Sequence, residues 1–331
     1  MPAPDAVDES ERLPEQLRRP FKVALAKAVE RMPGEEALPG GTVYEPKWDG
    51  FRLVIARDGG DTALWSRQQK DLTRSFPEIV EAASRLIPAG FAVDGEVVRW
   101  NENRLDFDAL QRRLSTSPRT VVRLVNDEPV SYVAFDLVAV AGRDLRGHPF
   151  HVRRTLLEEL ARSWDPPLSL SPSTGQREEA ERWMQELPEK GMEGIVAKGR
   201  DQRYNGGQRD WQKLRHRDTV ELVAGAVSGS LADPEALILG RYVDGTLRIV
   251  GRTTPIRRAG AGGLISRLRE PAGEHPWPDT ISLTSYDRFN KKTRTPVTLI
   301  EPIVVEVSAD TSLVGGSLRH PARFVRVRPE V

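Results

Sequence analysis

The sequence predicts an α+β protein with two domains, and three observations support this fold class. With 331 residues, the chain is long enough to bury two separate hydrophobic cores. Before Arg217, strand-like and helix-like patterns follow one another without regular alternation, which indicates largely antiparallel sheets flanked by helices. After Arg217, strand-like runs separated by Gly, Asp and Pro dominate, which indicates a small β-barrel. We therefore expect one domain at residues 21–217 and a second at 218–331.

The start of the chain is expected to carry little fixed structure. Residues 1–20 are rich in Glu, Arg and Pro, so we expect a flexible N-terminus. Residues 22–31 place Val23, Ala26 and Val29 at helical spacing, and they predict a helix.

Short strands and helices fill the rest of the first domain. Apolar runs predict strands at 51–56, 63–66, 91–100, 132–140, 193–198 and 210–215. Amphipathic spacing predicts helices at 76–86, 107–114, 152–162 and 176–187. The run at 132–140 is almost continuously apolar, which is typical of a strand buried on both faces.

The second domain is dominated by strands. Strand-like runs occur at 220–227, 237–243, 247–253, 303–307 and 323–327, with one helical stretch near 257–269. Five strands and one helix are typical of a barrel of the OB type. The linker between the domains is expected near residues 216–220.

The composition excludes several classes of protein. Hydrophobic residues make up 38% and charged residues 29% of the chain, and no apolar stretch approaches the roughly 20 residues of a membrane-spanning helix. Residues 1–10 do not show the basic-then-apolar pattern of a secretion signal, so we expect none. The absence of cysteine excludes disulfides and thiolate metal sites, so we expect a cytoplasmic protein. His148 and His151 come closest to a histidine metal site, and we interpret them as part of a polar loop.

The net charge is only +1, but basic residues gather near the domain boundary. Between residues 198 and 217 the basic residues are Lys198, Arg200, Arg203, Arg209, Lys213, Arg215 and Arg217, against Asp201 and Asp210. A charge run of this kind is usually a solvated face. Because this one surrounds Trp211 and an alternating strand pattern, we interpret it as a surface that faces phosphates.

One segment carries the strongest chemical signal in the chain. Residues 43–53 read Val-Tyr-Glu-Pro-Lys-Trp-Asp-Gly-Phe-Arg-Leu, so that Lys47 lies between an apolar run and an Asp-Gly turn. This arrangement holds one amine at the edge of a sheet, and a neutral lysine amine is a strong nucleophile. Alone, Lys-x-Asp-Gly is a common string that can simply precede a hairpin.

With five further segments, this one resembles the motif set of covalent nucleotidyltransferases, which include ATP-dependent DNA ligases, RNA ligases and mRNA-capping enzymes. The further segments follow in the order of the family: Leu-Trp-Ser-Arg-Gln at 64–68, Val-Asp-Gly-Glu-Val at 93–97, Val-Ala-Phe-Asp-Leu at 133–137, Glu-Gly-Ile-Val-Ala-Lys at 193–198 and Trp-Gln-Lys-Leu-Arg at 211–215. In that family the lysine attacks the α-phosphate of a nucleoside triphosphate and carries the nucleotide as a phosphoramidate. The resemblance implies that Lys47 is this nucleophile and that ATP is the cofactor.

The resemblance also implies the contacts of the nucleotide. Glu96 would bind the ribose hydroxyl, Phe135 would stack on the purine, and Glu45 would lie near the adenine. Alternation along a strand puts Lys213 and Arg215 on one face, where both would neutralise charge on the α-phosphate.

Further residues would serve the metal, the nucleophile and the DNA. Glu96 and Glu193 would lie near a divalent ion, Mg²⁺ or Mn²⁺. Lys198 would favour the neutral amine of Lys47 by like-charge repulsion. Ser66 and Arg67 would contact the nucleotide and the nick, and Arg52 would lie near the 5′-phosphate of the nick.

The residues between the motifs narrow the resemblance to bacterial ligases of the end-joining type. Residues 198–211 and 305–321 are most similar to the short, two-domain C-type ligases of actinobacteria, and the resemblance covers about residues 20–328. Such relatives end in a strand resembling Arg-x-Arg-x-Asp-Lys, which orients the pyrophosphate. Arg326 and Arg328 match it, whereas Glu330 and Val331 replace its last two residues, a departure that bears on the efficiency of the first step.

The function expected from this resemblance is the ATP-dependent sealing of nicks in DNA repair, through a lysyl-AMP and a DNA-adenylate intermediate. The expected partners are nicked double-stranded DNA and DNA-repair proteins, for a monomer in the cytoplasm that associates with the nucleoid and not with a membrane. We also expect the linker near 216–220 to act as a hinge between adenylylation and DNA binding. Two alternatives remain at this point: an RNA ligase or capping-type guanylyltransferase, and a non-catalytic nucleic-acid-binding relative. The repair pathway, the preferred metal and the tolerance of RNA at the nick stay open.

Overall fold

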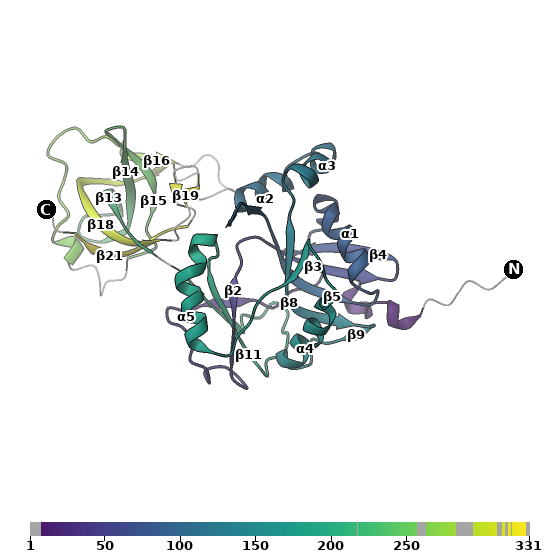
Figure 1. Ribbon diagram of the computed structural model, residues 1–331. Coiled ribbons are helices and arrows are strands. Elements are labelled where there is room, and N and C mark those ends of the chain that lie inside the picture. Colours follow the sequence, from purple (N-terminus) through teal and green to yellow (C-terminus); the bar gives the residue numbers. More distant parts are fainter. Residues whose placement is uncertain are drawn as a thin grey trace. The chain divides into compact units, whose positions relative to one another are not determined.

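Strands and helices follow one another irregularly in the first two thirds of the chain, and strands dominate the last third (Figure 1). The computed structural model describes residues 8–216, 218–256, 263–282, 294–309, 313–314, 317–318 and 320–328. The chain divides into two units, Met1–His216 and Arg217–Val331, each with a hydrophobic core of its own. This architecture confirms the predicted α+β fold class with largely antiparallel sheets.

A six-stranded sheet forms one half of the first unit. Its strands lie in the order β10-β8-β5-β3-β4, with β9 paired to β8, and only β8 and β10 pair in parallel. The strands are β3 (Phe51–Asp58), β4 (Asp61–Ser66), β5 (Ala92–Val98), β8 (Ser131–Val140), β9 (Arg143–Asp144) and β10 (Leu168–Leu170). Strand β8 is buried along nearly its whole length, as its continuous apolar run predicts.

A four-stranded sheet forms the other half of the first unit, in the order β1-β12-β11-β2. Its strands are β1 (Ala26–Ala28), β2 (Thr42–Lys47), β11 (Gly194–Gly199) and β12 (Trp211–Arg215). One face of this sheet packs against helix α5 (Arg177–Glu186) through a small apolar core that includes Tyr44, Ala180 and Ile195 (Figure 1).

Helices cover the six-stranded sheet. They are α1 (Pro77–Leu86), α2 (Phe107–Leu114), α3 (Pro118–Asp127) and α4 (Phe150–Ala161). The first unit also contains four short 3-10 turns, η1 (Glu9–Glu11), η2 (Glu15–Leu17), η3 (Thr73–Ser75) and η4 (Leu187–Lys190). Helix α2 has the predicted bounds because Asp106 caps it by accepting a hydrogen bond from the Ala109 amide. Helix α3 was not predicted, although Ser117 followed by Pro118 is a typical helix start.

The two sheets pack against each other through a third core that includes Val54, Phe135, Tyr204 and Trp211. The described part of the N-terminal segment joins this core. Leu13 and Leu17 are fully buried in it, so the expectation of a flexible segment at residues 1–20 is wrong for residues 8–20. Sparse apolar residues in a charged segment are enough to anchor it when the core offers a site for them.

One local prediction in the first unit is also wrong. Residues 22–31 contain the short strand β1 in place of a helix, because Ala26–Ala28 pair with β12. The Asp-Gly at 94–95 lies inside β5, within the predicted strand, where a Cβ at Gly95 would lie 2.5 Å from the Tyr132 ring. The Asp-Gly after Lys47 joins β2 to β3, which belong to different sheets.

The second unit is a five-stranded sheet in the order β15-β14-β13-β18-β21. Its strands are β13 (Asp218–Gly229), β14 (Pro234–Val243), β15 (Thr246–Arg252), β18 (Thr298–Ala309) and β21 (Arg323–Val327), with β16 (Thr280–Ser282), β17 (Arg294–Pro296), β19 (Leu313–Val314) and β20 (Ser317–Leu318) in small pairs. A bridge between Thr253 and Ala322 joins the two edges of the sheet, because these residues follow β15 and precede β21. This closure confirms the OB-type barrel.

Some sequence predictions lie outside the described residues. They concern Arg217, residues 257–262 of the predicted helix in the barrel, part of the 315–321 segment, and the last residues Glu330 and Val331. In the described part of the chain, no helix is long and apolar enough to cross a bilayer.

Candidate active site

Lys47 is the last residue of β2, where the chain leaves the four-stranded sheet for the six-stranded one. Its carbonyl accepts a hydrogen bond of 2.9 Å from the Glu193 amide, and its Nζ donates a hydrogen bond to Glu193 Oε2. Both side chains keep some exposure, 19% for Lys47 and 16% for Glu193. The segments around Lys47 and Glu193 therefore meet at one open edge of the sheet.

Strand β12 adds two cations to this edge. In the register of β11 with β12, Lys213 lies opposite Val196 and Arg215 opposite Gly194, while Lys47 lies opposite Gly194 from the other side. Arg215 Nη2 is 3.9 Å from Glu193 Oε2. A Cβ at Gly194 would lie 2.1 Å from the Leu214 carbonyl, so only glycine allows the strands to approach here.

The cations of this edge act on one another. Burial lowers the pKa of Lys213, and the like charges of Arg215, Lys47 and Arg67 lower it further. Arg67 is exposed in the turn after β4, where Ser66 Oγ accepts a hydrogen bond of 3.0 Å from the Lys70 amide. The structure thus gathers the predicted residues Lys47, Glu193, Lys213, Arg215 and Arg67 around one positively charged edge.

Glu96 approaches the same edge from the six-stranded sheet, where it lies opposite Arg52 in the neighbouring strand. Burial raises the pKa of Glu96 to about 8, although the charges of Lys47 and Arg52 oppose this shift. At neutral pH and without a metal ion, this carboxyl is therefore largely protonated and can form a hydrogen bond with a sugar hydroxyl, whereas a metal ion would bind it as the carboxylate.

Arg52, expected near the 5′-phosphate of the nick, is paired with a buried carboxylate and is 14% exposed. Its guanidinium donates to both oxygens of Asp94, at 3.0 and 2.5 Å, and to the Ala24 carbonyl at 2.6 Å. Asp94 is fully buried and also accepts a hydrogen bond of 2.6 Å from Tyr204. Burial disfavours the charged guanidinium, but Asp94 outweighs it and the net pKa of Arg52 is raised. Arg52 is thus a partly buried cation whose guanidinium carbon lies 5.2 Å from the centre of the Phe135 ring.

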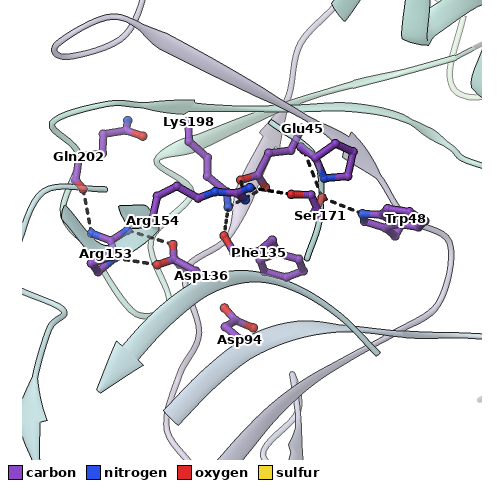
Figure 2. A network of polar contacts seen from close by, with 12 residues as sticks. Glu45, Trp48, Asp94, Phe135, Asp136, Arg153, Arg154, Ser171, Lys198 and Gln202 are labelled. Atoms are coloured by element: carbon purple, nitrogen blue, oxygen red, sulfur yellow. Dashed lines mark hydrogen bonds and ion pairs between the residues drawn. The ribbon is translucent and has the colours of Figure 1, made fainter. Parts of the chain in front are cut away.

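Lys198 belongs to a second group of charges, sealed inside the unit (Figure 2). Its Nζ is 2.8 Å from Glu45 Oε2 and donates to the Phe135 carbonyl at 2.8 Å. Lys198 is 1% exposed and Glu45 2% exposed. Burial lowers the pKa of Lys198 and raises the pKa of Glu45, and their contact opposes both shifts.

The expected action of Lys198 on Lys47 is therefore wrong. Lys198 lies opposite Val43, four residues along β11 from Gly194, which lies opposite Lys47. Four residues of strand span about 13 Å, too far for strong repulsion between partly screened charges. Lys213 is the lysine whose charge interacts with that of Lys47. Lys198 instead links Glu45 to Phe135, the two residues expected at the adenine.

Sequence analysis missed three residues beside this sealed group, namely Arg154, Ser171 and Trp48. Arg154 Nη2 donates to the Ser171 carbonyl at 2.8 Å, and Ser171 Oγ accepts from Trp48 Nε1 at 2.9 Å. Arg154 Nη1 is 3.6 Å from Glu45 Oε1. The available signal was an arginine on the buried side of α4, between the core residues Phe150 and Leu157.

Arg326 and Arg328 lie in the second unit, at the end of β21. Arg326 Nε donates to Glu306 Oε2 at 2.8 Å, and Arg328 Nε is 3.2 Å from the same oxygen and 2.8 Å from Glu221 Oε1. The hydrogen bond from Arg326 lowers the pKa of Glu306. Both arginines are thus held by carboxylates of their own barrel.

The oxygen ligands near Lys47 fit a Mg²⁺ ion that arrives with a nucleotide. No cluster of three or more histidine and carboxylate side chains suited to a metal ion occurs among the residues that the structure describes. Mg²⁺ is commonly bound by only one or two carboxylates together with substrate phosphates. Glu193 and Glu96 supply two such carboxyl groups beside an edge that can hold phosphates.

The known proteins to which this chain is similar in sequence are DNA ligases. A family model described as "ATP dependent DNA ligase domain" matches residues 16–215. The chain is 34% identical to DNA ligase C2 of Mycolicibacterium smegmatis, over 94% of this chain and 91% of that one. It is 33% identical to DNA ligase C of Mycobacterium tuberculosis, over 94% and 90% of the two chains.

Solved structures that are similar to this chain also include DNA ligases. The ligase domain of LigD from M. tuberculosis matches with a TM-score of 0.50 and 26% identity, over 93% of this chain and 96% of that one. A structure from a study of Lig E DNA ligases matches with a TM-score of 0.53 and 15% identity, over 92% and 99% of the two chains, and this likeness concerns the fold alone.

Proposed function

The chain belongs to the family of ATP-dependent DNA ligases, and we propose that Lys47 is the residue on which this ligase carries AMP. The observation that supports this assignment best is the edge of the sheet where Lys47 meets the Glu193 carboxylate between the cations Lys213 and Arg215. An alternative reading as an RNA ligase, a capping enzyme or a non-catalytic relative is not favoured, because the relatives are DNA ligases.

In the first step, the neutral amine of Lys47, which has already given one proton to water, attacks the α-phosphorus of ATP, and its nitrogen gives a second proton to water as the phosphoramidate forms. The new nitrogen–phosphorus bond forms as the bond between the α-phosphorus and the bridging oxygen breaks, and pyrophosphate leaves with that oxygen. Lys213 and Arg215 neutralise the charge on the α-phosphate oxygens during this exchange. Glu193 orients the amine through its hydrogen bond.

Glu193 and Glu96 would hold Mg²⁺ together with the phosphates of ATP. When bound, the ion would supply charge neutralisation on the phosphate oxygens. We assign Glu96 to the ribose hydroxyl and Phe135 to the purine.

In the second and third steps, AMP passes from Lys47 to the 5′-phosphate of a nick, and the adjacent 3′-hydroxyl then displaces it. We assign Arg67 and Ser66 to this DNA substrate, since Ser66 ends β4, Arg67 follows it in the turn, and the charge of Arg67 acts on Lys213. Arg326 and Arg328 of the barrel orient pyrophosphate in the first step, with the segment near 216–220 as the hinge. We propose that the enzyme acts as a monomer in DNA repair in the cytoplasm.

The mass of the intact protein tests the assignment of Lys47. After incubation with Mg-ATP, the wild-type protein should gain one AMP, and Lys47→Ala should gain none, a loss of more than about a thousandfold in rate. Mg-GTP serves as the nucleotide control, and the untreated sample shows whether AMP is already bound. An AMP adduct on Lys47→Ala would refute the assignment.

A further inference from the structure

We propose that Arg154 is a positioning residue that holds both flanks of Lys47, through Glu45 on one side and through Ser171 and Trp48 on the other. The proposal rests on the proposed function, in which Lys47 accepts AMP. Figure 2 shows how Arg154 reaches from its helix between Glu45 and Ser171.

We call the two sets of contacts that Arg154 makes its first and second arm. The first arm is the contact with Glu45, which lies two residues before Lys47 on the same face of β2. Lys198 binds Glu45 Oε2, whereas Glu45 Oε1 is buried without a hydrogen bond among the described residues. Arg154 Nη1 is also buried without a hydrogen bond among the described residues, and it lies 3.6 Å from Glu45 Oε1. Arg154 is thus the second cation that supports a carboxylate with almost no exposure to water.

The second arm runs to Trp48, the residue directly after Lys47. Arg154 Nη2 donates to the backbone carbonyl of Ser171, whose hydroxyl accepts from the Trp48 indole. Ser171 is fully buried. Trp48 packs on a small core that includes Met192, the residue directly before Glu193. The second arm therefore fixes the side chains that flank both Lys47 and Glu193.

A planar guanidinium suits this task better than an ammonium group. Arg154 uses separate nitrogens for Ser171 and Glu45, while its Nε binds Glu158 one turn along α4 at 2.7 Å. A lysine keeps the charge but cannot address three directions in one plane. The guanidinium of Arg154 therefore couples Glu45, which is expected near the adenine, to Trp48, the residue after the nucleophile.

The two arms have different kinetic consequences. Because Glu45 is expected near the adenine, loss of its support should raise the KM for ATP in the first step. Because Trp48 adjoins the nucleophile, loss of its anchor should lower the maximal rate of AMP transfer to Lys47. An arginine with only a structural role would change the fraction of active protein and leave both constants unaltered.

The test measures the rate of lysyl-AMP formation against ATP concentration in full-length protein freed of AMP. The variants are Arg154→Lys and Ser171→Ala, which keeps the Ser171 carbonyl. Arg57→Lys is the matched control, since Arg57 is also 8% exposed and its partners lie at the far end of β3. The burst amplitude reports the active fraction separately from the rate constants.

We expect Arg154→Lys to raise the KM for ATP and to lower the maximal rate, each by about tenfold, which corresponds to about 1.4 kcal/mol. Ser171→Ala should lower the maximal rate by about threefold or more, with little change in KM. Arg57→Lys should alter neither. The proposal is refuted if Arg154→Lys behaves as Arg57→Lys does, or if it changes only the burst amplitude.

A double-mutant cycle keeps the second arm testable if Arg154→Lys does not fold. Ser171→Ala and Trp48→Phe remove the same hydrogen bond, so their effects on the maximal rate should not add. Additive effects would refute the second arm. If the wild-type protein itself forms no lysyl-AMP, the proposed function fails, and the two failures are thereby distinguished.

Discussion

Two pairs of lysine and glutamate, Lys47 with Glu193 and Lys198 with Glu45, lie on β2, on β11 or directly before β11, and they differ mainly in burial. We call Lys47, Glu193, Lys213 and Arg215 the open cluster, and Lys198, Glu45 and Arg154 the sealed cluster. Lys47 is 19% exposed, whereas Lys198 is 1% exposed. Both lysines bind a glutamate, yet only the lysine of the open cluster is exposed enough to meet a substrate. The comparison shows that burial, more than residue type, separates reactive from supporting charges.

The surroundings of each lysine explain the difference. The Lys198 Nζ lies 4.4 to 4.9 Å from the ring centres of Trp211, Phe150 and Phe135, in addition to its two polar partners. Such cation–π contacts stabilise the charge and exclude other ligands. In the open cluster, several cations repel one another beside a single carboxylate, which favours the arrival of an anion such as a phosphate.

Removal of the sealed lysine should produce the largest loss of stability. Lys198→Met leaves the Glu45 carboxylate deeply buried with only Arg154 near it, so the free energy of unfolding should fall by about 3–5 kcal/mol. Urea unfolding at 25 °C measures this change. A fall of less than about 1 kcal/mol would mean that the sealed cluster is not needed for the fold.

Removal of the open lysine should act on catalysis instead. Lys213→Met should slow the formation of lysyl-AMP by about 100- to 1000-fold, because it removes charge stabilisation from the transition state. Its free energy of unfolding should stay within about 1 kcal/mol of the wild type, since Lys213 is only half-buried among like charges. Lys213→Arg, which keeps the charge, is the control. Equal losses of stability in Lys213→Met and Lys198→Met would remove the distinction between the clusters.

The pH dependence of stability sharpens the role of Glu96, whose pKa is raised to about 8 in the folded protein. Between about pH 4.5 and 8 the folded state binds more protons at this residue than the unfolded state. The stability of the wild type should therefore fall across this window relative to Glu96→Gln, by at least about 1.4 kcal/mol, and should level off above pH 8. Thermal or urea unfolding of both proteins at several pH values gives the difference. Parallel curves would show that Glu96 has an ordinary pKa.

The smallest effect is expected in the barrel, where Arg326 is bound to Glu306. Arg326→Ala should slow lysyl-AMP formation by up to about tenfold through its effect on the leaving pyrophosphate. It should leave the sealing of DNA that is already adenylylated unchanged, because that step releases no pyrophosphate. Single-turnover assays of the two steps separate these outcomes, and an equal loss in both would contradict the assignment.

Much of the fold could be predicted because most of its elements carry a local signal. Helix α2 appears at its predicted bounds, and the apolar run of β8 is buried as expected. The predictions failed where pairing with distant residues decided the outcome. Ala26–Ala28 form a strand through β12, although their spacing is helical. Leu13 and Leu17 are buried by a core to which the rest of the chain contributes.

The candidate site shows the same division. The motifs around Lys47, Glu193 and Lys213 predicted residues that the structure brings together. Arg52 and Lys198 carry equally clear motif matches, but the structure pairs them with the buried carboxylates Asp94 and Glu45. Arg154 and Ser171 lie in no recognised motif and depend on contacts between segments far apart in the sequence.

The sequence by itself determined the α+β fold class, the barrel and the membership of a family, because each depends on local pattern or on ordered motifs, and the same motifs predict Lys47 as the nucleophile. Only the tertiary structure decided which charges stay open to a substrate and which are sealed. The physical reason is that burial and the pairing of charges depend on strand register and on the packing of two sheets, which bring together residues distant in the chain.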